Sequence, residues 1–223
     1  MRFWGMVVFG VLGTAILLSL GIWQLQRLAW KQEVLRAIES KILAPAVEIP
    51  QTVLPDAHSL LPVRAEGRYK GDTVRVLVSQ KIYGAGYRLI TAFELVDGRT
   101  IMLDRGFTSV RSEIPSTPEG RGQVIGNLQW PQEIDSFTPE NDLAANIWFA
   151  RDVARLAEHL KAEPVLLVLR DSSFETEAAT PLPKMTANIP NDHMNYAITW
   201  FSLALIWLGM SGYFLYRSRD PQS

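Results

Sequence analysis

The stretch Asn191–Phe201, with the sequence NDHMNYAITWF, decides how this chain is organised. It leads into an uncharged run, Met194–Tyr216, and about 20 apolar residues are enough to cross the hydrocarbon core of a bilayer. Asn or Asp at the start of such a run is a preferred helix cap. The sequence therefore predicts a transmembrane helix whose first turn carries His193, at the point where the helix leaves the membrane.

One face of this helix supports two interpretations. Counted from His193, the residues Tyr196, Ala197 and Trp200 follow at i+3, i+4 and i+7, so they share a face. A neutral imidazole is the commonest side-chain ligand of metals, and the two rings offer flat surfaces beside it. Alternatively, Tyr and Trp are enriched at membrane interfaces in general, and a polar residue at the end of a span is ordinary.

A second uncharged run, Phe3–Trp23, predicts a first transmembrane helix. A cleaved signal peptide is the alternative, but the run is long for one and no clear small-x-small cleavage site follows it. Its start close to Met1 leaves no room for a transit peptide, which favours a bacterial origin. Arg217 and Arg219 directly follow the second run, and this charge bias favours a cytoplasmic C-terminus.

The topology divides the chain into four expected segments. These are 1–26 (first transmembrane helix with a short cytoplasmic N-terminus), 27–193 (periplasmic domain), 194–216 (second transmembrane helix) and 217–223 (cytoplasmic tail). Because both spans end at the outer face of the membrane, the residues that follow the first span could meet those that precede the second. The expected location is the bacterial inner membrane, with the main domain in the periplasm.

Basic and aromatic residues continue the first helix beyond the membrane. Trp23, Arg27 and Trp30 follow an i, i+4, i+7 pattern, with Lys31 on a neighbouring line. An aromatic belt with snorkelling bases explains the pattern without a ligand. The other interpretation is that these basic and aromatic side chains form a surface that binds an anionic group. Such a surface, together with His193, would suit a planar amphiphile with carboxylates, such as haem.

The segment between the spans has the two-residue period of β-strands. An Asp97-Gly98 pair predicts a tight hairpin, and the stretch 70–72 predicts a turn between two further strands. The expected strands are 63–69, 73–79, 88–96, 100–108, 123–130, 147–150 and 164–170, with a helix at 152–161. The predicted fold class is thus an α+β membrane protein in which two transmembrane helices flank a mainly antiparallel β exported domain with one helix. Small residues, Gly10 with Thr14 and Ser202 with Gly209, would permit close packing of the spans.

Composition and motifs exclude several functions. The net charge of −1 gives no case for nucleic acid binding, and the absence of cysteine excludes disulfides and thiolate sites. There is no Gly-x-Ser-x-Gly elbow and no His-Glu-x-x-His helix. His58, in a proline-rich linker, and His159, on the predicted helix, are expected to have no ligand role. A sensor is the alternative from another class, but it would need a separate partner because only seven residues follow Tyr216.

Several short motifs, in order along the chain, resemble those of the Surfeit locus protein 1 family, which are assembly factors for cytochrome c oxidase. They are Gly21-Ile-Trp23-Gln24 with Arg27 and Trp30-Lys31, Gly67-Arg-Tyr69, Gly86-Tyr87, Asp97-Gly98, Asp104-Arg105-Gly106-Phe107, Asn146-Ile-Trp148-Phe149-Ala-Arg151-Asp152 and Asn191-Asp-His193 through Tyr196 to Trp200-Phe201. Asp104 departs from the valine or asparagine expected before the Arg-Gly pair. Arg105 is expected to be structural and to pair with a nearby carboxylate.

The resemblance implies a role in maturing the haem a site of oxidase subunit I, without enzymatic activity. It implies transient haem a binding, with His193 as the iron ligand. The remaining site residues expected around the haem are Tyr196, Trp200, Trp23, Arg27 and Lys31. The implied partners are oxidase subunit I, membrane lipid and, as a further candidate, haem a synthase. A haem-independent scaffold that stabilises an oxidase assembly intermediate is the alternative within this family.

Overall fold

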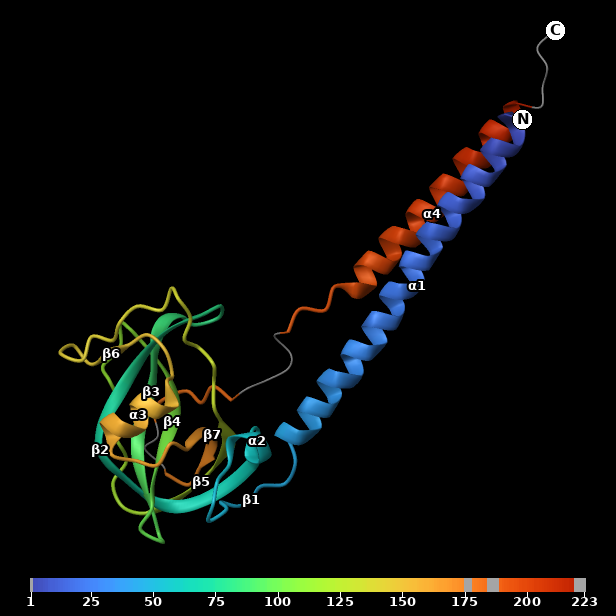
Figure 1. Ribbon diagram of the computed structural model, residues 1–223. Helices are drawn as coiled ribbons and strands as arrows, with labels where there is room; N and C mark the ends of the chain where they lie inside the picture. The colour runs from blue at the N-terminus through green and yellow to red at the C-terminus, as the bar shows by residue number, and fades with distance from the viewer. Residues whose placement is uncertain (1, 175–177, 184–188, 219–223) are drawn as a thin grey trace. The chain divides into compact units, whose positions relative to one another are not determined.

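The computed structural model describes residues 2–174, 178–183 and 189–218 (Figure 1). The chain forms two compact units. One comprises residues 1–39 and 186–223, and the other comprises residues 40–185. The first unit contains most of helix α1 (Arg2–Ile42) and all of helix α4 (His193–Arg217). The second contains the strands and two short helices, α2 (Pro55–His58) and α3 (Val153–Leu160).

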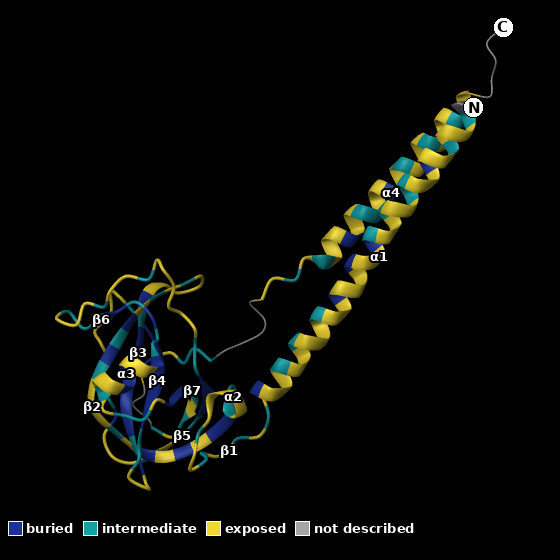
Figure 2. Ribbon diagram, viewed as in Figure 1, coloured by how far each residue is buried: buried dark blue, intermediate teal, exposed yellow. Residues whose placement is uncertain are grey.

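Helices α1 and α4 pack side by side in opposite directions (Figure 1). Most of the less exposed positions recur every three or four residues, as in a coiled coil, and Figure 2 shows them where the helices face each other. We call these positions the seam. On α1 they are Phe3, Val7, Gly10, Thr14, Leu17, Gly21, Gln24, Leu28 and Lys31, and on α4 they are His193, Ala197, Trp200, Ala204, Trp207, Ser211 and Leu215.

Small residues let the two helices approach closely. A Cβ atom built on Gly13 would lie 2.4 Å from the indole nitrogen of Trp207, and one built on Gly21 would lie 2.7 Å from the ring of Phe201. The predicted packing of the two helices is confirmed, and Gly10 belongs to the seam as expected. The prediction for Ser202 and Gly209 is wrong: both are exposed, because the heptad phase set by Ala197 and Ala204 turns them to the opposite side of α4.

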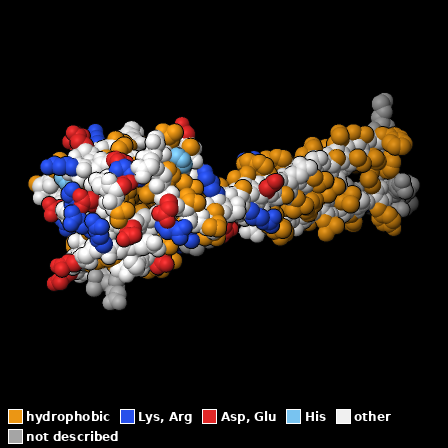
Figure 3. Space-filling view, turned by 90° about the horizontal axis from the view of Figure 1, so that it is seen from below, with side chains coloured by type: hydrophobic (Ala, Val, Ile, Leu, Met, Phe, Trp, Pro, Cys, Tyr) orange, Lys and Arg blue, Asp and Glu red, His pale blue; other side chains and the backbone are white. Residues whose placement is uncertain are grey.

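Both helices are long and apolar enough to cross a membrane. We call the first unit, with helices α1 and α4, the helical unit. Figure 3 shows apolar side chains along most of it, with charged side chains gathered toward one end. Those charges belong to the part of α1 that begins at Arg27. The expected arrangement, in which two apolar helices flank an α+β domain, is confirmed.

In the second unit, one curved sheet closes on itself. Strand β2 pairs antiparallel with β5 over residues 62–67 and with β3 from Gly67 onward, so the order β2-β3-β4-β7-β5 returns to β2. The short strands β1 and β6 each add a parallel pairing to β2. The strands of the described residues are β1 (Val47–Glu48), β2 (Pro62–Gln80), β3 (Gly84–Leu95), β4 (Thr100–Ser109), β5 (Gly122–Gln129), β6 (Ile147–Trp148) and β7 (Leu166–Ser172).

Alternation along the strands gives the sheet an apolar layer on each face. On β7, Leu167 and Leu169 join the cluster enclosed by the sheet, whereas Leu166 and Val168 join the cluster under helix α3. Leu156 of α3 is fully buried in this second cluster. Helix α3 begins at its predicted position because the Asp152 side chain accepts hydrogen bonds from the amides of Ala154 and Arg155.

The hairpin predicted at Asp97-Gly98 is confirmed. Gly98 has a φ of +88°, and the amide of Gly98 donates to the carbonyl of Leu95 at 3.0 Å. The loop is a turn followed by a glycine in the left-handed region, which is the usual three-residue hairpin connection.

The turn predicted at residues 70–72 is wrong, because β2 runs through it as one strand. Lys70 and Thr73 pair with the adjacent residues Ala92 and Thr91 of β3, which leaves two extra residues as a bulge. Gly71 supplies the positive φ of +73°, and a bulge uses such a glycine as readily as a turn does. The strand predicted at 147–150 is reduced to the two residues of β6.

Candidate functional site

His193 and Gln24 form a hydrogen bond across the seam. The imidazole Nδ1 lies 2.8 Å from Oε1 of Gln24, and Gln24 is buried while the histidine is partly exposed. An amide oxygen only accepts, so Nδ1 carries the proton in this arrangement. The second ring nitrogen, Nε2, then carries the lone pair, and no group of the described residues is bonded to it. The histidine is therefore anchored on one side and available to a ligand on the other.

A second contact ties the same parts of the chain together. The ammonium group of Lys31, on α1, donates to the backbone carbonyl of Pro190, which precedes α4. The stretch around residues 23–31 and the stretch that begins at Asn191 thus meet, as the two-span topology led us to expect. Asn191 Oδ1 is buried, with no hydrogen-bond partner within the described ranges, so the polar contacts at this end of α4 are incomplete.

The contacts between the helices identify two sides of the seam. Phe9 and Trp207 meet on one side, with ring centroids 5.1 Å apart. On the other side, Gly21 faces the ring of Phe201. An α-helix turns by 100° per residue, so the angular position of each residue around its helix follows from its number. These angles put Phe9 and Trp207 on one side of the seam and Phe201 on the other, and they assign the remaining residues to a side in the same way.

The predicted site residues fall on the seam or on its Phe9–Trp207 side. By this count Trp23 and Arg27 of α1 share that side with Tyr196 of α4. Trp23 is 53% exposed and Tyr196 is 56% exposed, so both rings present accessible surfaces. The guanidinium carbon of Arg27 lies 4.0 Å from the ring centroid of Trp30, an attractive cation–π distance.

Trp200 belongs to the seam itself and is half-buried. It is two turns into α4 from His193, so it lies deeper in the apolar part of the helical unit. The arrangement offers one imidazole nitrogen, accessible aromatic rings and two cations. This chemistry fits a flat, largely apolar group that carries negative charge at one edge, and haem is such a group. The incomplete polar contacts of Asn191 are consistent with a further polar group at the site.

The second unit contains a buried ion network that the sequence reasoning missed. Asp104 is fully buried, and its Oδ2 lies 2.6 Å from Nε of Arg88 and 3.5 Å from Nη1 of Arg151. Arg151 also binds both carboxylate oxygens of Glu133. The departure from the family pattern at Asp104 therefore places a carboxylate between two arginines. The partners are distant in sequence, so no local pattern joins them, although Asp104 and Arg151 each belong to one of the family motifs.

The contacts between Glu133 and Arg151 favour the charged form of both groups. Burial alone would raise the pKa of Glu133, but hydrogen bonds and the charge of Arg151 outweigh burial and hold the pKa below its ordinary value. Burial alone would lower the pKa of Arg151, but the hydrogen bonds and charges of Glu133 and Asp104 outweigh burial and raise it. The guanidinium of Arg105 donates to the carbonyls of Pro115 and Ser116, and its pairing with a carboxylate stays a prediction.

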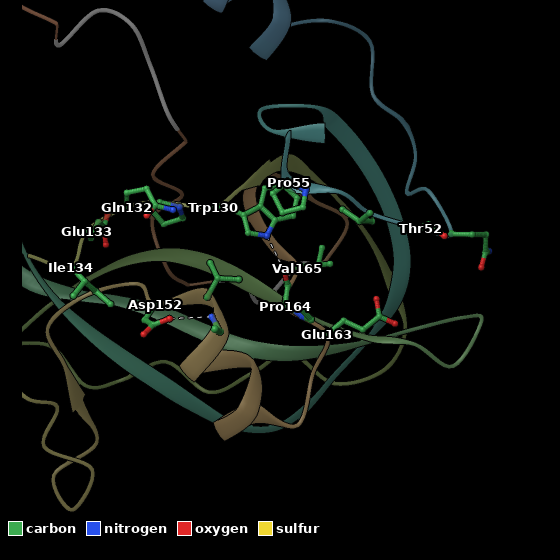
Figure 4. A pocket seen from close by; sticks show the side chains of 15 residues that line it. Thr52, Pro55, Trp130, Gln132, Glu133, Ile134, Asp152, Glu163, Pro164 and Val165 are labelled. Atoms are coloured by element: carbon green, nitrogen blue, oxygen red, sulfur yellow. Dashed lines mark hydrogen bonds between the residues drawn. The ribbon is translucent and has the colours of Figure 1, made fainter. Parts of the chain in front are cut away.

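A cavity of about 610 Å³ lies beside the first turn of α3 (Figure 4). Trp130 lines it, and its indole donates to the carbonyl of Pro164 at 2.9 Å. The carboxylates that line it have partners within the protein: Glu133 binds Arg151, Asp152 caps α3, and Glu163 lies 3.8 Å from Nη1 of Arg99. Because each of these carboxylates has a partner within the described residues, the helical unit remains the better candidate site.

An α+β domain with a closed sheet, flanked by two helices fit to span a membrane, defines the class of this protein. The chain belongs to the SURF1 family, whose model matches residues 11–205. It is 29% identical over 212 residues to Surfeit locus protein 1 of Homo sapiens, covering 83% of this chain and 69% of the human protein. It is also 29% identical over 225 residues to a SURF1-like protein of Rickettsia prowazekii, covering 94% of this chain and 88% of that protein. The family resemblance predicted from the motifs is confirmed.

Proposed function

We propose that this chain is a non-enzymatic assembly factor for cytochrome c oxidase that binds haem a transiently through His193 and aids its insertion into oxidase subunit I. The observation that carries the proposal is the hydrogen bond between His193 Nδ1 and Gln24. It orients the imidazole so that Nε2 is the nitrogen available to iron. Family membership supports the oxidase role, and the local chemistry supports the ligand.

Each residue of the site has a separate task in this proposal. Haem a brings an iron that accepts an axial nitrogen ligand, and His193 supplies that nitrogen. Trp23, Tyr196 and Trp200 pack against the apolar parts of the group. Arg27 and Lys31 carry donors for carboxylates, and charge-assisted hydrogen bonds of this kind are the strong ones. Lys31 keeps two further ammonium hydrogens beyond the one that it gives to Pro190.

The proposed location is the bacterial inner membrane, with residues 27–193 in the periplasm. In that topology His193 lies at the outer membrane surface, where a bound haem a can extend its hydrocarbon tail toward lipid. Oxidase subunit I is the proposed recipient, and haem a synthase is a further proposed partner. A group held at the membrane surface is positioned for transfer to another membrane protein.

The test is the haem a content of protein purified from cells that make haem a. We expect His193→Ala to insert and fold but to lose the pigment and its spectrum, because the iron loses its nitrogen ligand. The matched controls are His58→Ala and His159→Ala. His58 Nδ1 accepts from the amide of Leu54, and His159 packs against Trp148, so both should retain wild-type occupancy. Wild-type haem content in His193→Ala would favour the haem-independent scaffold instead.

A further inference from the structure

We infer that Gln24 is a positioning residue for His193: its side-chain oxygen holds the imidazole in the tautomer that carries the proton on Nδ1 and the lone pair on Nε2. The inference deepens the proposed function and rests on it for its meaning. The tautomer itself, however, is a property of the protein without haem. The two ideas can therefore fail separately.

Gln24 needs a hydrogen-bond partner because its side-chain amide is buried in the seam. It is 9% exposed and lies between Gly21 and Leu28, which are apolar seam positions one turn away on either side. An amide buried in an apolar helix interface is costly unless it is hydrogen-bonded. His193, the first residue of α4, supplies the bond at 2.8 Å. A buried amide and a histidine across two helices thus satisfy each other.

The direction of this hydrogen bond decides which nitrogen is free. With Oε1 facing the ring, Nδ1 must donate and Nε2 keeps its lone pair. With the amide group reversed, the NH₂ would donate to Nδ1 and Nε2 would carry the proton instead. The structure places Oε1 against the ring. Only this arrangement leaves a lone pair on Nε2, so the orientation of Gln24 controls whether His193 can act as a ligand through that nitrogen.

A hydrogen bond to the far nitrogen also tunes the ligand. When a metal-binding histidine donates its other N–H to an oxygen, its orientation is fixed and its basicity rises. Loss of such a partner typically costs about 10- to 100-fold in metal affinity. We therefore expect Gln24 to contribute to ligand affinity without contacting the ligand.

The first experiment measures the tautomer in the full chain without haem. The protein is labelled with ¹⁵N at histidine, purified in detergent from cells that make no haem a, and examined by NMR at about pH 8, above the ordinary pKa of histidine. His58 provides an internal reference of the opposite kind, because its Nδ1 accepts from the Leu54 amide at 2.9 Å and its proton must be on Nε2. We expect His193 to carry its proton on Nδ1. A proton on Nε2 of His193 in the wild type overturns the inference.

The second experiment changes the partner. Gln24→Leu removes the acceptor, whereas Gln24→Glu keeps one and strengthens it. The control is Gln26→Leu, the same change at an exposed position two residues further along α1. We expect His193 to lose its Nδ1–H preference in Gln24→Leu and to keep it in Gln24→Glu and Gln26→Leu. An unchanged His193 tautomer in Gln24→Leu would show that Gln24 only packs in the seam.

Haem a titration of the same three variants separates this inference from the proposed function. We expect the dissociation constant to rise about 10- to 100-fold in Gln24→Leu, with little change in Gln24→Glu and Gln26→Leu. If the tautomer responds as expected but the wild type takes up no haem a, the proposed function fails and the positioning role of Gln24 stands. If the wild type binds haem a and Gln24→Leu binds it equally well, the positioning role fails alone.

Discussion

The backbone of Gly106 in strand β4 lies against the carbonyl oxygen of Thr180. A Cβ atom built on Gly106 would come within 2.1 Å of that oxygen, and Gly106 has a φ of +114°. The neighbouring residue Phe107 exchanges two backbone hydrogen bonds with Thr180, of 2.7 and 2.9 Å. Two residues further on, the carbonyl of Leu182 accepts a bond from Arg88. Gly106 and Phe107 of the family motif, together with Arg88, therefore hold the stretch from Thr180 to Leu182 against the sheet.

Replacing Gly106 with alanine should destabilise the domain strongly. The new methyl group would meet backbone atoms that cannot move without breaking the Phe107–Thr180 bridge, and the positive φ adds strain. Gly84→Ala is the matched control, because Gly84 also has a positive φ, of +75°, but has open space around it. We expect the thermal midpoint of full-length protein to fall several degrees further in Gly106→Ala. Equal midpoints in the two variants would argue against the close contact.

Asp104→Asn should be among the most damaging changes in the domain. It removes the carboxylate that lies between Arg88 and Arg151, both largely buried. Breaking a buried ion pair by removing one partner typically costs about 3 to 5 kcal/mol. Glu94→Gln, which alters an ion pair between Glu94 and the exposed Arg68, is the control and should change little. The thermal midpoints of the two variants test this expectation. A small decrease for Asp104→Asn would mean that Arg88 and Arg151 find other partners.

The ion pair of Glu133 predicts a loss of stability in acid. Because Arg151 holds the folded-state pKa of Glu133 below its ordinary value, the pair stabilises the domain above the unfolded-state pKa of about 4.3. That contribution is lost as the pH falls through the lower folded-state pKa. We expect the thermal midpoint of Glu133→Gln to lie below the wild-type value near neutral pH. The gap should close as the pH falls below about 4. The exposed Glu140→Gln variant should show no such convergence, and a gap that is constant with pH would exclude this mechanism.

Local patterns predicted local structure well here. The period of two placed most strands, Asp97-Gly98 placed a hairpin, and Asp152 placed the start of α3. The bulge at Gly71 was mistaken for a turn because both need a residue with positive φ. The closure of the sheet could not be predicted, since it depends on β2 pairing with β5, which follows it by many residues. For the same reason the sequence indicated His193 as a candidate ligand but did not reveal Gln24 as its hydrogen-bond partner. It also did not reveal Asp104 as the centre of an ion network.

The membrane topology predicts where reporter proteins will be active. Arg217 and Arg219 follow the second apolar run, and such residues are enriched on the cytoplasmic side. A periplasmic reporter such as alkaline phosphatase should be active when fused after Pro118, within the domain, and inactive when fused after Ser223. A cytoplasmic reporter at the same two sites should give the reverse pattern. Phosphatase activity at Ser223 would place the C-terminus outside and contradict the proposed topology.

The aromatic residues of the site should matter less than the histidine. Tyr196 and Trp23 share the accessible side of the seam, and Trp200 is half-buried further along α4. In the proposed site these rings add packing to a bound haem a, whereas His193 bonds the iron. We therefore expect Tyr196→Ala and Trp200→Ala to retain part of the haem a that His193→Ala loses.

The spectrum separates the two kinds of residue. Loss of packing should lower haem a occupancy while the spectrum of the remaining haem stays that of the wild type, because the axial ligand is unchanged. Loss of the ligand should change the spectrum as well as the occupancy. Tyr213→Ala is the control, since Tyr213 is an exposed tyrosine of the same helix, 20 residues beyond His193. If Tyr196→Ala shifts the spectrum or abolishes binding as completely as His193→Ala, the tyrosine bonds the iron or its ligand, and the division of tasks proposed for this site is wrong.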